Sequence, residues 1–466
     1  KRQSLEGSSF AGLVSALAVG DRSAIDAGQW QVLINTGTNH LIAISGLHIG
    51  LAAAFGYGLS RRLVPVRVMN RVPAQHIAMV CAVFIASVYA MLAGFAIPTQ
   101  RALLMLLCVV AAVLLRRAFR PMDVLSAALI VILLWDPASV MSAGFWFSFL
   151  AVAVIFYSSG HSSQPRWLRW VLIQVVIALA LFPMSLFMFQ QTSLVSPLAN
   201  FFMVPYVSLL VVPLVLLGML LLPVSEAIAA TFFTVAGKLF EFVWPGLQWL
   251  SELGYSHWIK GQPGLVALLL ALAGLAILLA PGIRYRRFAG IFLLLPVVIS
   301  QPASPPAGGY DVHVLDVGQG LAVVIRTRSR SLVYDTGARF SERLDSGQAV
   351  ILPFLRNHGI KRIDLLMVSH GDGDHIGGAA SVLGAYPDTP VLGQGIDDLK
   401  AASAAPCTAG QSWVWDQVRF TVIHPDTEIY KASNNRSCVL KVEGRGGSAL
   451  IAGDIEKKVE YRLLRQ

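Results

Sequence analysis

The chain has 466 residues, of which 55% are hydrophobic and only 13% are charged, and its formal net charge is +10. Soluble domains carry about 25% charged residues, so this composition excludes an ordinary soluble protein and indicates a polytopic membrane protein with a further domain attached. Cytoplasmic arginines of any inner-membrane protein explain part of the positive charge, which is therefore weak evidence for a nucleic-acid partner.

Residues 1–39 carry charges of both signs and predict an external or interfacial N-terminal segment. The sequence starts at Lys1 without an initiator methionine, and no signal-peptide pattern is visible there. We therefore expect the natural protein to begin upstream of this chain.

Residues 40–300 are expected to form a transmembrane domain, because apolar stretches of spanning length follow one another with few charges. A helix needs about 20 such residues to cross the hydrocarbon core. The stretch 226–252 contains Lys238 and Glu241, and it either spans or lies in the interface as an amphipathic helix. The other spans are expected near 40–60, 76–95, 99–115, 122–135, 141–159, 168–189, 198–222, 264–281 and 287–300.

The arginines predict the orientation of these spans. They gather in four loops, whereas the intervening loops at 96–98, 136–140 and 190–197 contain none. By the positive-inside rule the arginine-rich loops are cytoplasmic, so the chain after the last span is expected outside the cytoplasm, in the periplasm of a bacterium. The arginines concerned are Arg61, Arg62, Arg67 and Arg71; Arg116, Arg117 and Arg120; Arg166 and Arg169; and Arg284, Arg286 and Arg287.

The C-terminal third has a different pattern. Residues 301–309, QPASPPAGG, predict a linker, and residues 310–466 predict a sheet-based, hydrolase-like α/β domain. Helices are expected at 348–358 and 376–384. Strands are expected within 310–320, 321–327, 331–337, 363–370, 418–425, 438–444 and 449–454.

The four cysteines fall into two pairs by environment. Cys81 and Cys108 lie in apolar runs and are expected to pack there as thiols. Cys407 and Cys438 lie in the C-terminal part, where they either form a disulfide in an oxidising compartment or remain free.

The run SHGDGDHIGG at 369–378 concentrates potential metal ligands in one glycine-rich loop after a predicted strand. His370, Asp372, Asp374 and His375 could converge on a divalent ion, which needs imidazole and oxygen ligands at about 2.0–2.2 Å. The alternative is a solvated polar turn that caps the next helix. Two histidines and two aspartates within six positions favour the metal site.

This run resembles the H-x-H-x-D-H signature of the metallo-β-lactamase fold, with Asp372 in place of the second histidine. The resemblance implies a second-shell role for Asp335 in LVYDTG and a bridging role between two metals for Asp454 in LIAGD. With HVLDVGQG (313–320) and NNRSCVL (434–440), the C-terminal part is similar to the external domain of the ComEC family of competence-type DNA uptake channels. The membrane part is similar to that family's competence region at 37–50, 98–105, 136–152 and 197–205.

The resemblance implies a polytopic α-helical membrane domain followed by an α/β metallo-β-lactamase-like (αββα) domain. The chain departs from the family pattern in three places. The family's N-terminal membrane hairpin and OB-like region are not present, and the chain ends at Gln466, before a C-terminal histidine motif would arrive. The usual third-motif histidine is not evident, and the polar candidates at its place are Asn434, Asn435 and Ser437.

The chemistry implied by the resemblance is phosphodiester hydrolysis by two divalent ions about 3.5–4 Å apart. His370 and Asp372 would hold one ion, Asp374 and His375 the other, and Asp454 would bridge them. The imidazoles suit Zn²⁺, and the aspartate at 372 makes Mn²⁺ a rival. Because the chain ends early, the second ion site is expected to be incomplete in it.

A DNA strand cannot cross hydrocarbon and needs a polar route between helices. Residues expected along this route are Asn39, His40, Ser45, His48, Gln100, Arg101, Asn200 and the stretch 146–148, with Gly46 and Gly50 breaking the first helix. The alternative for each is a hydrogen bond to a neighbouring helix, or an arginine that reaches the interface.

The sequence thus predicts an inner-membrane channel that takes up single-stranded DNA during natural transformation, with an external nuclease that degrades the other strand. The expected partners are DNA, membrane lipid, and the DNA-receptor and motor proteins of an uptake machinery. Two alternatives stay open. One is a membrane-anchored metallo-hydrolase, and the other is a transporter whose degenerate external domain only binds DNA.

Overall fold

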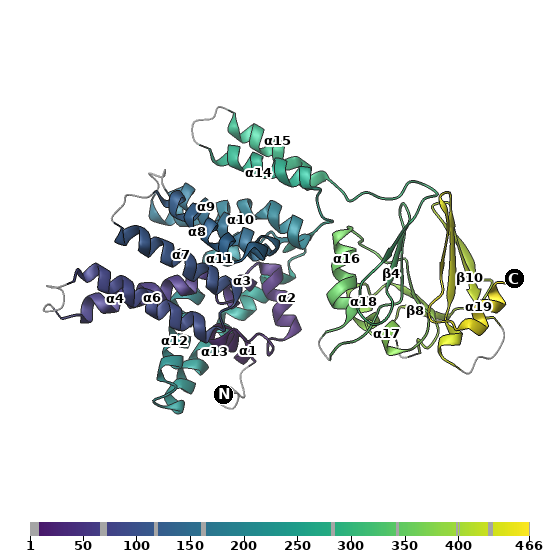
Figure 1. The fold of residues 1–466 in the computed structure, drawn as a ribbon, viewed down its shortest axis with the longest axis horizontal. Coiled ribbons are helices and arrows are strands. Elements are labelled where there is room, and N and C mark those ends of the chain that lie inside the picture. The colour runs from purple at the N-terminus through teal and green to yellow at the C-terminus, as the bar shows by residue number, and fades with distance from the viewer. Residues whose placement is uncertain are drawn as a thin grey trace. The chain divides into compact units, whose positions relative to one another are not determined.

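The computed structural model of the chain describes residues 9–65, 72–115, 120–159, 165–280, 285–341, 344–397, 399, 401–426 and 432–465. The chain divides into two compact units. The helical unit comprises Lys1–Trp258 and Leu265–Val298, and the sheet unit comprises Ile259–Gly264 and Ile299–Gln466. In Figure 1 the helical unit runs from purple to teal and the sheet unit from green to yellow.

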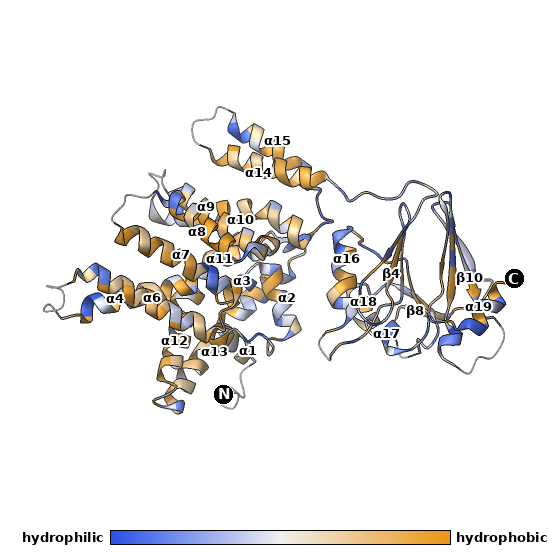
Figure 2. Ribbon diagram, in the orientation of Figure 1, coloured by the Kyte–Doolittle hydropathy of each residue, from blue (hydrophilic) through white to orange (hydrophobic). Residues whose placement is uncertain are grey.

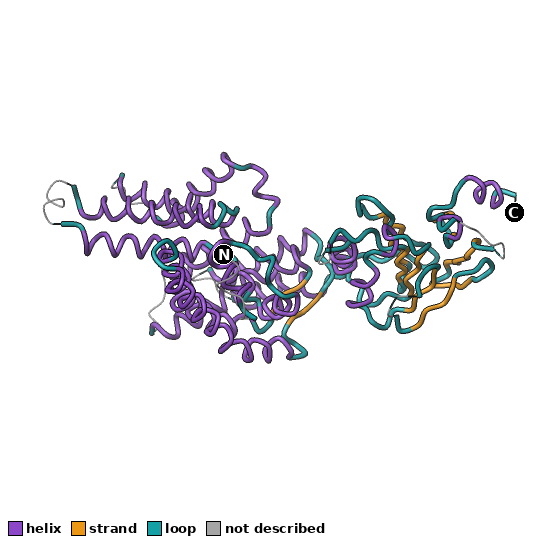
Figure 3. Tube along the Cα trace, turned by 90° about the horizontal axis from the view of Figure 1, so that it is seen from below, coloured by secondary structure: helices purple, strands orange, loops and turns teal. Residues whose placement is uncertain are grey.

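The helical unit consists of helices with one short pair of strands, β1 and β2 (Figure 3). Its elements are α1 (Ala11–Val19), α2 (Ala27–Thr36), α3 (Asn39–Ile42), α4 (Gly46–Leu63), α6 (Ala74–Leu92), α7 (Ile97–Leu114), α8 (Pro121–Trp135), η2 (Pro137–Met141), α9 (Ala143–Ser159), α10 (Arg166–Phe189), β1 (Gln191–Ser193), α11 (Ser196–Tyr206), η3 (Val207–Val211), α12 (Val212–Leu221), α13 (Glu226–Glu252), β2 (His257–Ile259), α14 (Leu265–Leu279) and α15 (Arg286–Ile299).

Five helices in the described ranges are long and apolar enough to cross a membrane: Ala74–Leu92, Ile97–Leu114, Trp167–Phe189, Ser196–Leu221 and Glu226–Glu252. Three shorter apolar helices are Pro121–Trp135, Ala143–Tyr157 and Leu265–Leu279. Hydrophobic residues dominate these helices in Figure 2. The stretch 226–252, which the sequence left open, is one helix with the length and composition of a span.

The expected span at 40–60, in which a break at Gly46 and Gly50 was predicted, consists of two separate helices. The chain forms the short helix α3, leaves helical geometry at Ala43, and begins α4 at Gly46 with Ser45 extended as its N-cap. The break therefore precedes Gly46, and Gly50, which was expected to weaken the helix, lies inside α4 with open space around it. At the other end of this unit, the expected span 287–300 corresponds to the 14-residue helix α15, which contains Pro296.

The N-terminal helices α1 and α2 belong to the helical unit, although residues 1–39 were expected to form an external or interfacial segment. Leu13 and Leu17 of α1 are fully buried in a core shared with Val211 of η3 and Phe240 of α13. Both leucines lie on one face of α1 because a spacing of four residues returns to the same side of a helix.

Only some of the arginines that were used to predict the orientation lie within the described residues. Arg61 and Arg62 lie in the last turn of α4, Arg120 precedes α8, and Arg286 begins α15. Arg166 and Arg169 lie in the first turn of α10, and Arg287 follows Arg286 in α15. The other five orienting arginines lie outside the described residues: Arg67, Arg71, Arg116, Arg117 and Arg284.

The sheet unit contains a six-stranded and a four-stranded sheet. The six-stranded sheet has the order β3-β4-β5-β6-β7-β8, and its last three neighbouring pairs, from β5 to β8, are parallel. The strands are β3 (Asp311–Val314), β4 (Val323–Arg326), β5 (Ser331–Tyr334), β6 (Leu365–Val368), β7 (Pro390–Gly393) and β8 (Ser403–Pro406). The four-stranded antiparallel sheet has the order β12-β11-β10-β9, with β9 (Ser412–Trp415), β10 (Val418–His424), β11 (Val439–Gly444) and β12 (Gly447–Ile451).

Alternation along the strands divides the core of this unit into two layers. Val324, Val333 and Leu366 face helices, whereas Val323, Leu332 and Met367 face the four-stranded sheet. Successive side chains of a strand point to opposite faces, so strands buried on both faces read as continuous apolar runs. The helical elements are η4 (Gly347–Ile351), α16 (Leu352–Asn357), α17 (Gly373–Ile376), α18 (Ala379–Ala385), η5 (Asn434–Arg436) and α19 (Lys457–Leu463).

The seven strands expected from the sequence are confirmed as β3, β4, β5, β6, β10, β11 and β12. The helix expected at 348–358 is confirmed as η4 with α16, and the one at 376–384 divides into α17 and α18 at the Gly377–Gly378 pair. Within the expected linker, Gly308 donates to the carbonyl of Asp416 at 2.7 Å, so that end packs on the sheet unit.

Candidate metal centre

The candidate metal centre lies where the parallel strands β5 and β6 end side by side. Tyr334 at the end of β5 pairs with Met367 of β6, and the chains continue into Asp335 and Ser369–His370. Asp335 has a φ of 56°, and its backbone N–H donates to the carbonyl of Met367 at 2.8 Å. This left-handed turn directs the Asp335 carboxylate toward the loop that follows β6.

Asp335 is completely buried, and its carboxylate accepts several hydrogen bonds. Oδ1 accepts from the backbone N–H of Ser369 at 2.6 Å, and Oδ2 accepts from the Ser369 hydroxyl at 2.7 Å and from Nδ1 of His375 at 2.7 Å. A buried carboxylate is costly unless its oxygens are bonded in this way. These hydrogen bonds tie the loop after β6 and the ring of His375 to Asp335.

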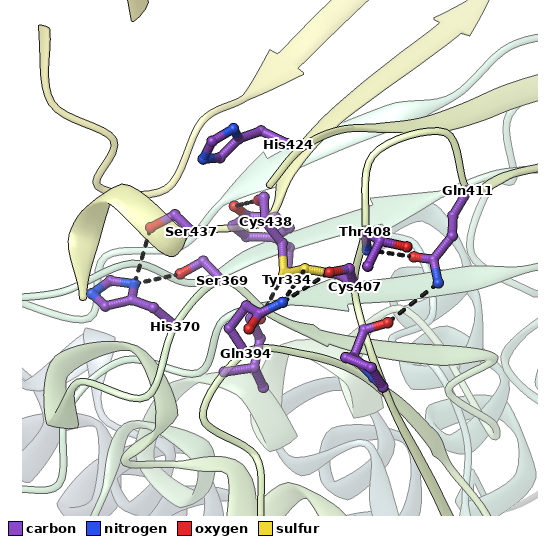
Figure 4. The surroundings of a disulfide bond; sticks show 12 residues. Tyr334, Ser369, His370, Gln394, Cys407, Thr408, Gln411, His424, Ser437 and Cys438 are labelled. Atoms are coloured by element: carbon purple, nitrogen blue, oxygen red, sulfur yellow. Dashed lines mark hydrogen bonds between the residues drawn. A yellow bond between two sulfur atoms is a disulfide. The ribbon is translucent and has the colours of Figure 1, made fainter. Parts of the chain in front are cut away.

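These hydrogen bonds also indicate which ring nitrogen of each histidine carries the hydrogen. Since the carboxylate accepts, Nδ1 of His375 donates to it, and in the neutral imidazole Nε2 then keeps its lone pair. The Ser369 hydroxyl gives its hydrogen to Asp335, so Nδ1 of His370, 2.9 Å away, donates to Ser369 and leaves Nε2 of His370 unprotonated (Figure 4). Both imidazoles thus offer Nε2 as a ligand atom.

Three potential ligands converge among the described residues: His370, His375 and Asp454 have ligand atoms within 4.8 Å of one another. The two rings are 4.2 Å apart between centroids, and Nε2 of His375 is 3.4 Å from Oδ2 of Asp454. Both histidines are about 1% exposed, whereas Asp454 is exposed. The donor set of two imidazoles and a carboxylate fits a divalent ion that approaches from the exposed side.

Negative charge surrounds His375. Burial by itself disfavours the imidazolium, but the hydrogen bond to Asp335 and the charges of Asp335, Asp454 and Asp374 outweigh it and raise the pKa of His375 above its ordinary value. The same charges favour a bound cation.

The two aspartates of the motif lie beside this group. Oδ2 of Asp372 is 3.3 Å from Nε2 of His370, and Oδ1 accepts from the Ser433 hydroxyl at 2.9 Å. Asp372 precedes α17, but its side chain caps no backbone N–H of that helix, so the alternative of a merely capping turn finds no support here. Asp374 is half-buried and is not part of the converging group.

The segment HVLDVGQG (313–320) packs against the backbone of the metal motif at Asp374. Gly320 has a φ of 112°, and a Cβ placed on it would lie 2.0 Å from the backbone oxygen of Asp374. Leu321 N–H donates to that oxygen at 3.3 Å. Only glycine fits at 320, because both the left-handed φ and the close approach exclude a side chain.

Of the three polar candidates expected at the place of the third histidine, one contacts the metal motif directly. Ser437 is buried, and its hydroxyl is 3.3 Å from Nδ1 of His370 and accepts from the N–H of Asp454 at 3.3 Å. Asn435 points elsewhere, because its amide exchanges hydrogen bonds with Glu456 at 2.7 and 3.0 Å. Asn434 begins η5 and is half-buried.

The polar residues expected along a DNA route are distributed over several elements of the helical unit. Asn39 begins α3, and Nδ1 of His40 lies 3.0 Å from the carbonyl of Gly37. Asn200 of α11 donates to the same carbonyl at 3.4 Å and to Ser196 at 2.9 Å. The break between α2 and α4 is therefore tied to α11 by polar contacts.

The remaining route residues lie near the starts of α4, α7 and α9. The N–H of Ser45 donates to Nδ1 of His48 at 3.3 Å, and Arg101 donates to Ser142 at 3.2 Å. The Gln100 amide donates to the carbonyl of Phe95, and the Trp146 indole donates to that of Val140. We call five residues with a buried polar atom that has no partner in the described ranges the buried polar set: His48 (Nε2), Arg101 (Nε), Ser139 (Oγ), Asn200 (Oδ1) and Ser208 (Oγ).

Sequence reasoning missed Ser369, Ser433 and Gly320. Ser369 stands directly before His370, so its position at a strand end was a usable signal. Ser433 lies outside the NNRSCVL element. Its contact with Asp372 joins residues 61 positions apart, and nothing in the local pattern predicts such a contact.

Two family models match the chain. The model described as Competence protein matches residues 17–284, and the model of the metallo-beta-lactamase superfamily matches residues 315–465. The chain is 32% identical to Recombination protein 2 of Haemophilus influenzae, over the whole chain and 64% of that protein.

It is also 34% identical to Competence protein ComA of Neisseria gonorrhoeae and 27% identical to ComE operon protein 3 of Bacillus subtilis. Each of these alignments covers 97% of the chain, with 63% and 61% of the respective relative. The chain thus spans less than two thirds of the length of the three relatives.

Proposed function

The chain belongs to the competence protein family, of the ComEC type with a metallo-β-lactamase domain, and from this membership we propose that it serves DNA uptake. One strand passes through the helical unit, and the sheet unit hydrolyses phosphodiester bonds of the other strand. The observation that carries the hydrolytic part is the convergence of His370, His375 and Asp454 at the ends of neighbouring strands.

The donor set suits Zn²⁺ or Mn²⁺, and a second ion would need Asp372 and Asp374 as well. Such ions would stabilise negative charge on a phosphate and supply a nucleophile at neutral pH. The protein's own contribution is preorganisation. Asp335 and Ser369 fix the tautomer and orientation of both imidazoles, and such outer partners change metal affinity about 10–100-fold when they are lost.

Metal analysis tests the hydrolytic proposal. We expect the purified chain to bind Zn²⁺ or Mn²⁺, and replacement of His370, Asp372, Asp374 and His375 by alanine to abolish this binding. Equal metal content in the wild type and the quadruple variant would contradict the site. The pair Asp388→Ala and Asp397→Ala offers a control outside the motif.

For the strand, we propose a route along the break at residues 36–50 and the buried polar set. Neutral histidine and asparagine side chains bind phosphate and bases weakly, which suits passage, because conduction requires release as well as binding. Polar groups without hydrogen-bond partners inside apolar helices cost free energy, and a role in the route would explain why they are present.

Thiol accessibility tests this route. In a background without Cys81 and Cys108, cysteines at positions 39, 40, 45 and 48 should react with a small aqueous reagent, and bulky adducts should block DNA uptake at unchanged protein level. The lipid-facing candidate Phe84, 67% exposed in the helical unit, provides a control position. Inert cysteines at all four positions would move the route elsewhere.

We further propose that the sheet unit is external, in the periplasm of a Gram-negative host. The arginine pattern supports this orientation, and so does the bond between Cys407 and Cys438, because disulfides persist in oxidising compartments. Ser304 is exposed, so a cysteine there should react with a membrane-impermeant reagent on spheroplasts. Reaction only after lysis would reverse the orientation.

A further inference from the structure

The disulfide lies directly beside the candidate metal centre. Cys407 follows β8 of the six-stranded sheet, and Cys438 precedes β11 of the four-stranded sheet. The two Cα atoms are 6.1 Å apart, and both residues are completely buried. The bond therefore links the two sheets next to the segment that ends in Ser437 (Figure 4).

On the Cys438 side, the backbone is held by the strand ends that form the centre. Its N–H donates to the carbonyl of Ser369 at 2.9 Å, and its carbonyl accepts from the Tyr334 hydroxyl at 2.5 Å. Burial raises the pKa of Tyr334, and the charges of Asp335 and Asp454 act in the same direction, so the phenol stays a neutral donor. Ser437, one residue earlier, contacts His370.

On the Cys407 side, the chain is held by the end of β7. The Gln394 amide donates to the carbonyl of Cys407 at 2.8 Å, and the N–H of Cys407 donates to the carbonyl of Gly393 at 3.3 Å. Because Cys407 is held at the end of β7, the disulfide also fixes the position of Cys438.

The segment 432–437 has little other regular structure to hold it. It contains only the single turn η5, and strand pairing begins at Val439. Yet it delivers two hydroxyls to the metal motif, from Ser433 to Asp372 and from Ser437 to His370. These contacts persist only while the segment stays close to the loop after β6.

We propose that the Cys407–Cys438 disulfide is a positioning clamp for this segment, and that it sets the metal affinity of the centre by holding Ser433 and Ser437 against Asp372 and His370. The proposal rests on the metal site put forward above. It assigns to the two cysteines a role toward the ion without direct ligation, because their sulfurs are consumed in the bond.

The first test removes the bond by Cys407→Ser and, separately, by Cys438→Ser in the full chain. With Mn²⁺ as the probe, we expect an apparent Kd at least about 10-fold weaker than that of the wild type. Cys81→Ala and Cys108→Ala, which alter free cysteines of the helical unit, should leave the Kd unchanged. A Kd within twofold of wild type in both serine variants would overturn the proposal.

The second test keeps the native sequence. A phosphine reductant opens the bond in the folded protein: the phosphine supplies two electrons, and water supplies the two thiol protons and the oxygen of the phosphine oxide. Hydrogen exchange should then accelerate at the amides of 432–438 more than in β10 and β11, and reoxidation should restore both protection and Mn²⁺ affinity. Loss of protection across the whole unit, in the reduced protein or in a serine variant that fails to fold, would show a global structural role and overturn the local clamp.

The two readouts also separate this proposal from the metal site. If the wild type binds no ion, the metal site fails, while the exchange of 432–438 still decides whether the bond holds the segment. If the wild type binds Mn²⁺ and the reduced protein binds it equally, only the clamp fails.

Discussion

The candidate metal centre of the sheet unit and the buried polar set of the helical unit are both groups of polar side chains, but they differ in how their polar atoms are hydrogen-bonded. At the centre, Asp335 accepts from Ser369 and His375, and Ser369 also contacts His370. In the buried polar set, each residue keeps at least one polar atom without a partner in the described ranges, including Nε2 of His48 and Nε of Arg101.

Under the proposed function, this difference corresponds to two kinds of task. A site that holds an ion gains from ligands fixed in advance, since the ion then does not have to order them. A route for a polyanion needs groups that can exchange partners as the strand moves, and tight pairing among themselves would prevent this. We therefore expect that the removal of a polar group lowers the stability of the candidate metal centre but has little effect on stability in the buried polar set.

The largest effect is expected for Asp335→Asn. The amide would place N–H groups against donors that now meet a carboxylate, so we expect the free energy of unfolding of the sheet unit to fall by about 3 kcal/mol. The ion affinity should fall about 10–100-fold, because His375 loses its fixed tautomer. Denaturant unfolding and Mn²⁺ titration measure the two effects.

Asp316→Asn is the matched control, since Asp316 is exposed and its side chain accepts a local hydrogen bond from the N–H of Gly318 at 3.2 Å. It should change the free energy of unfolding by less than about 0.5 kcal/mol. Equal losses in the two variants would remove the distinction between a bonded centre and an ordinary polar surface.

A second, smaller effect should separate two glycines of the same loop. Gly320→Ala brings a Cβ to 2.0 Å from the oxygen of Asp374, whereas Gly318→Ala meets nothing within 4 Å. Both have positive φ, so each substitution costs about 1–2 kcal/mol of stability from backbone strain. Only Gly320→Ala should also weaken Mn²⁺ binding, because it displaces the turn that contains Asp374 and His375.

Gly318→Ala is the control for the backbone strain that both substitutions introduce. If Gly318→Ala weakened ion binding as much as Gly320→Ala, the contact with Asp374 would not be the cause, and the loop 315–320 would act through its own conformation.

The smallest effect is expected in the helical unit. Ser208→Ala removes a buried hydroxyl without a partner in the described ranges, so the free energy of unfolding should change by less than about 0.5 kcal/mol or rise slightly. Thr36→Val removes a buried hydroxyl that donates to the carbonyl of Val32 at 2.8 Å and lies 2.9 Å from the Thr38 hydroxyl, and should cost about 1 kcal/mol. Unfolding in mixed micelles measures both, and a larger loss for Ser208→Ala would contradict the contrast between the two regions.

Local pattern was sufficient to predict the loop with His370 and His375 and seven strands, β6 among them. The apolar runs of β4, β5 and β6 are buried on both faces. The strands β7, β8 and β9 were not predicted. β8 reads Ser-Ala-Ala-Pro and is exposed throughout, so it is a strand because of its pairing with β7 and not because of its own hydrophobicity.

The sequence predicted candidate ligands for the candidate metal centre but not the residues that hydrogen-bond to them. The roles of Ser369 and Ser433 depend on the left-handed turn at Asp335 and on a contact between distant segments, neither of which leaves a local signal. The break before α4 was anticipated from Gly46 and Gly50, but the helix ends earlier, at Ile42, because Ser45 is extended and caps the next helix.

DNA uptake by cells that carry His370→Ala is the most direct test of coupled transport and hydrolysis. Labelled duplex DNA is offered, and both the imported label and the nucleotides released outside are counted, at equal levels of folded protein. The account predicts that release of nucleotides falls at least about 100-fold, as expected for loss of an ion-holding ligand, and that import falls with it. Unchanged release and import in this variant would contradict the account and leave the sheet unit as a dispensable attachment to the channel.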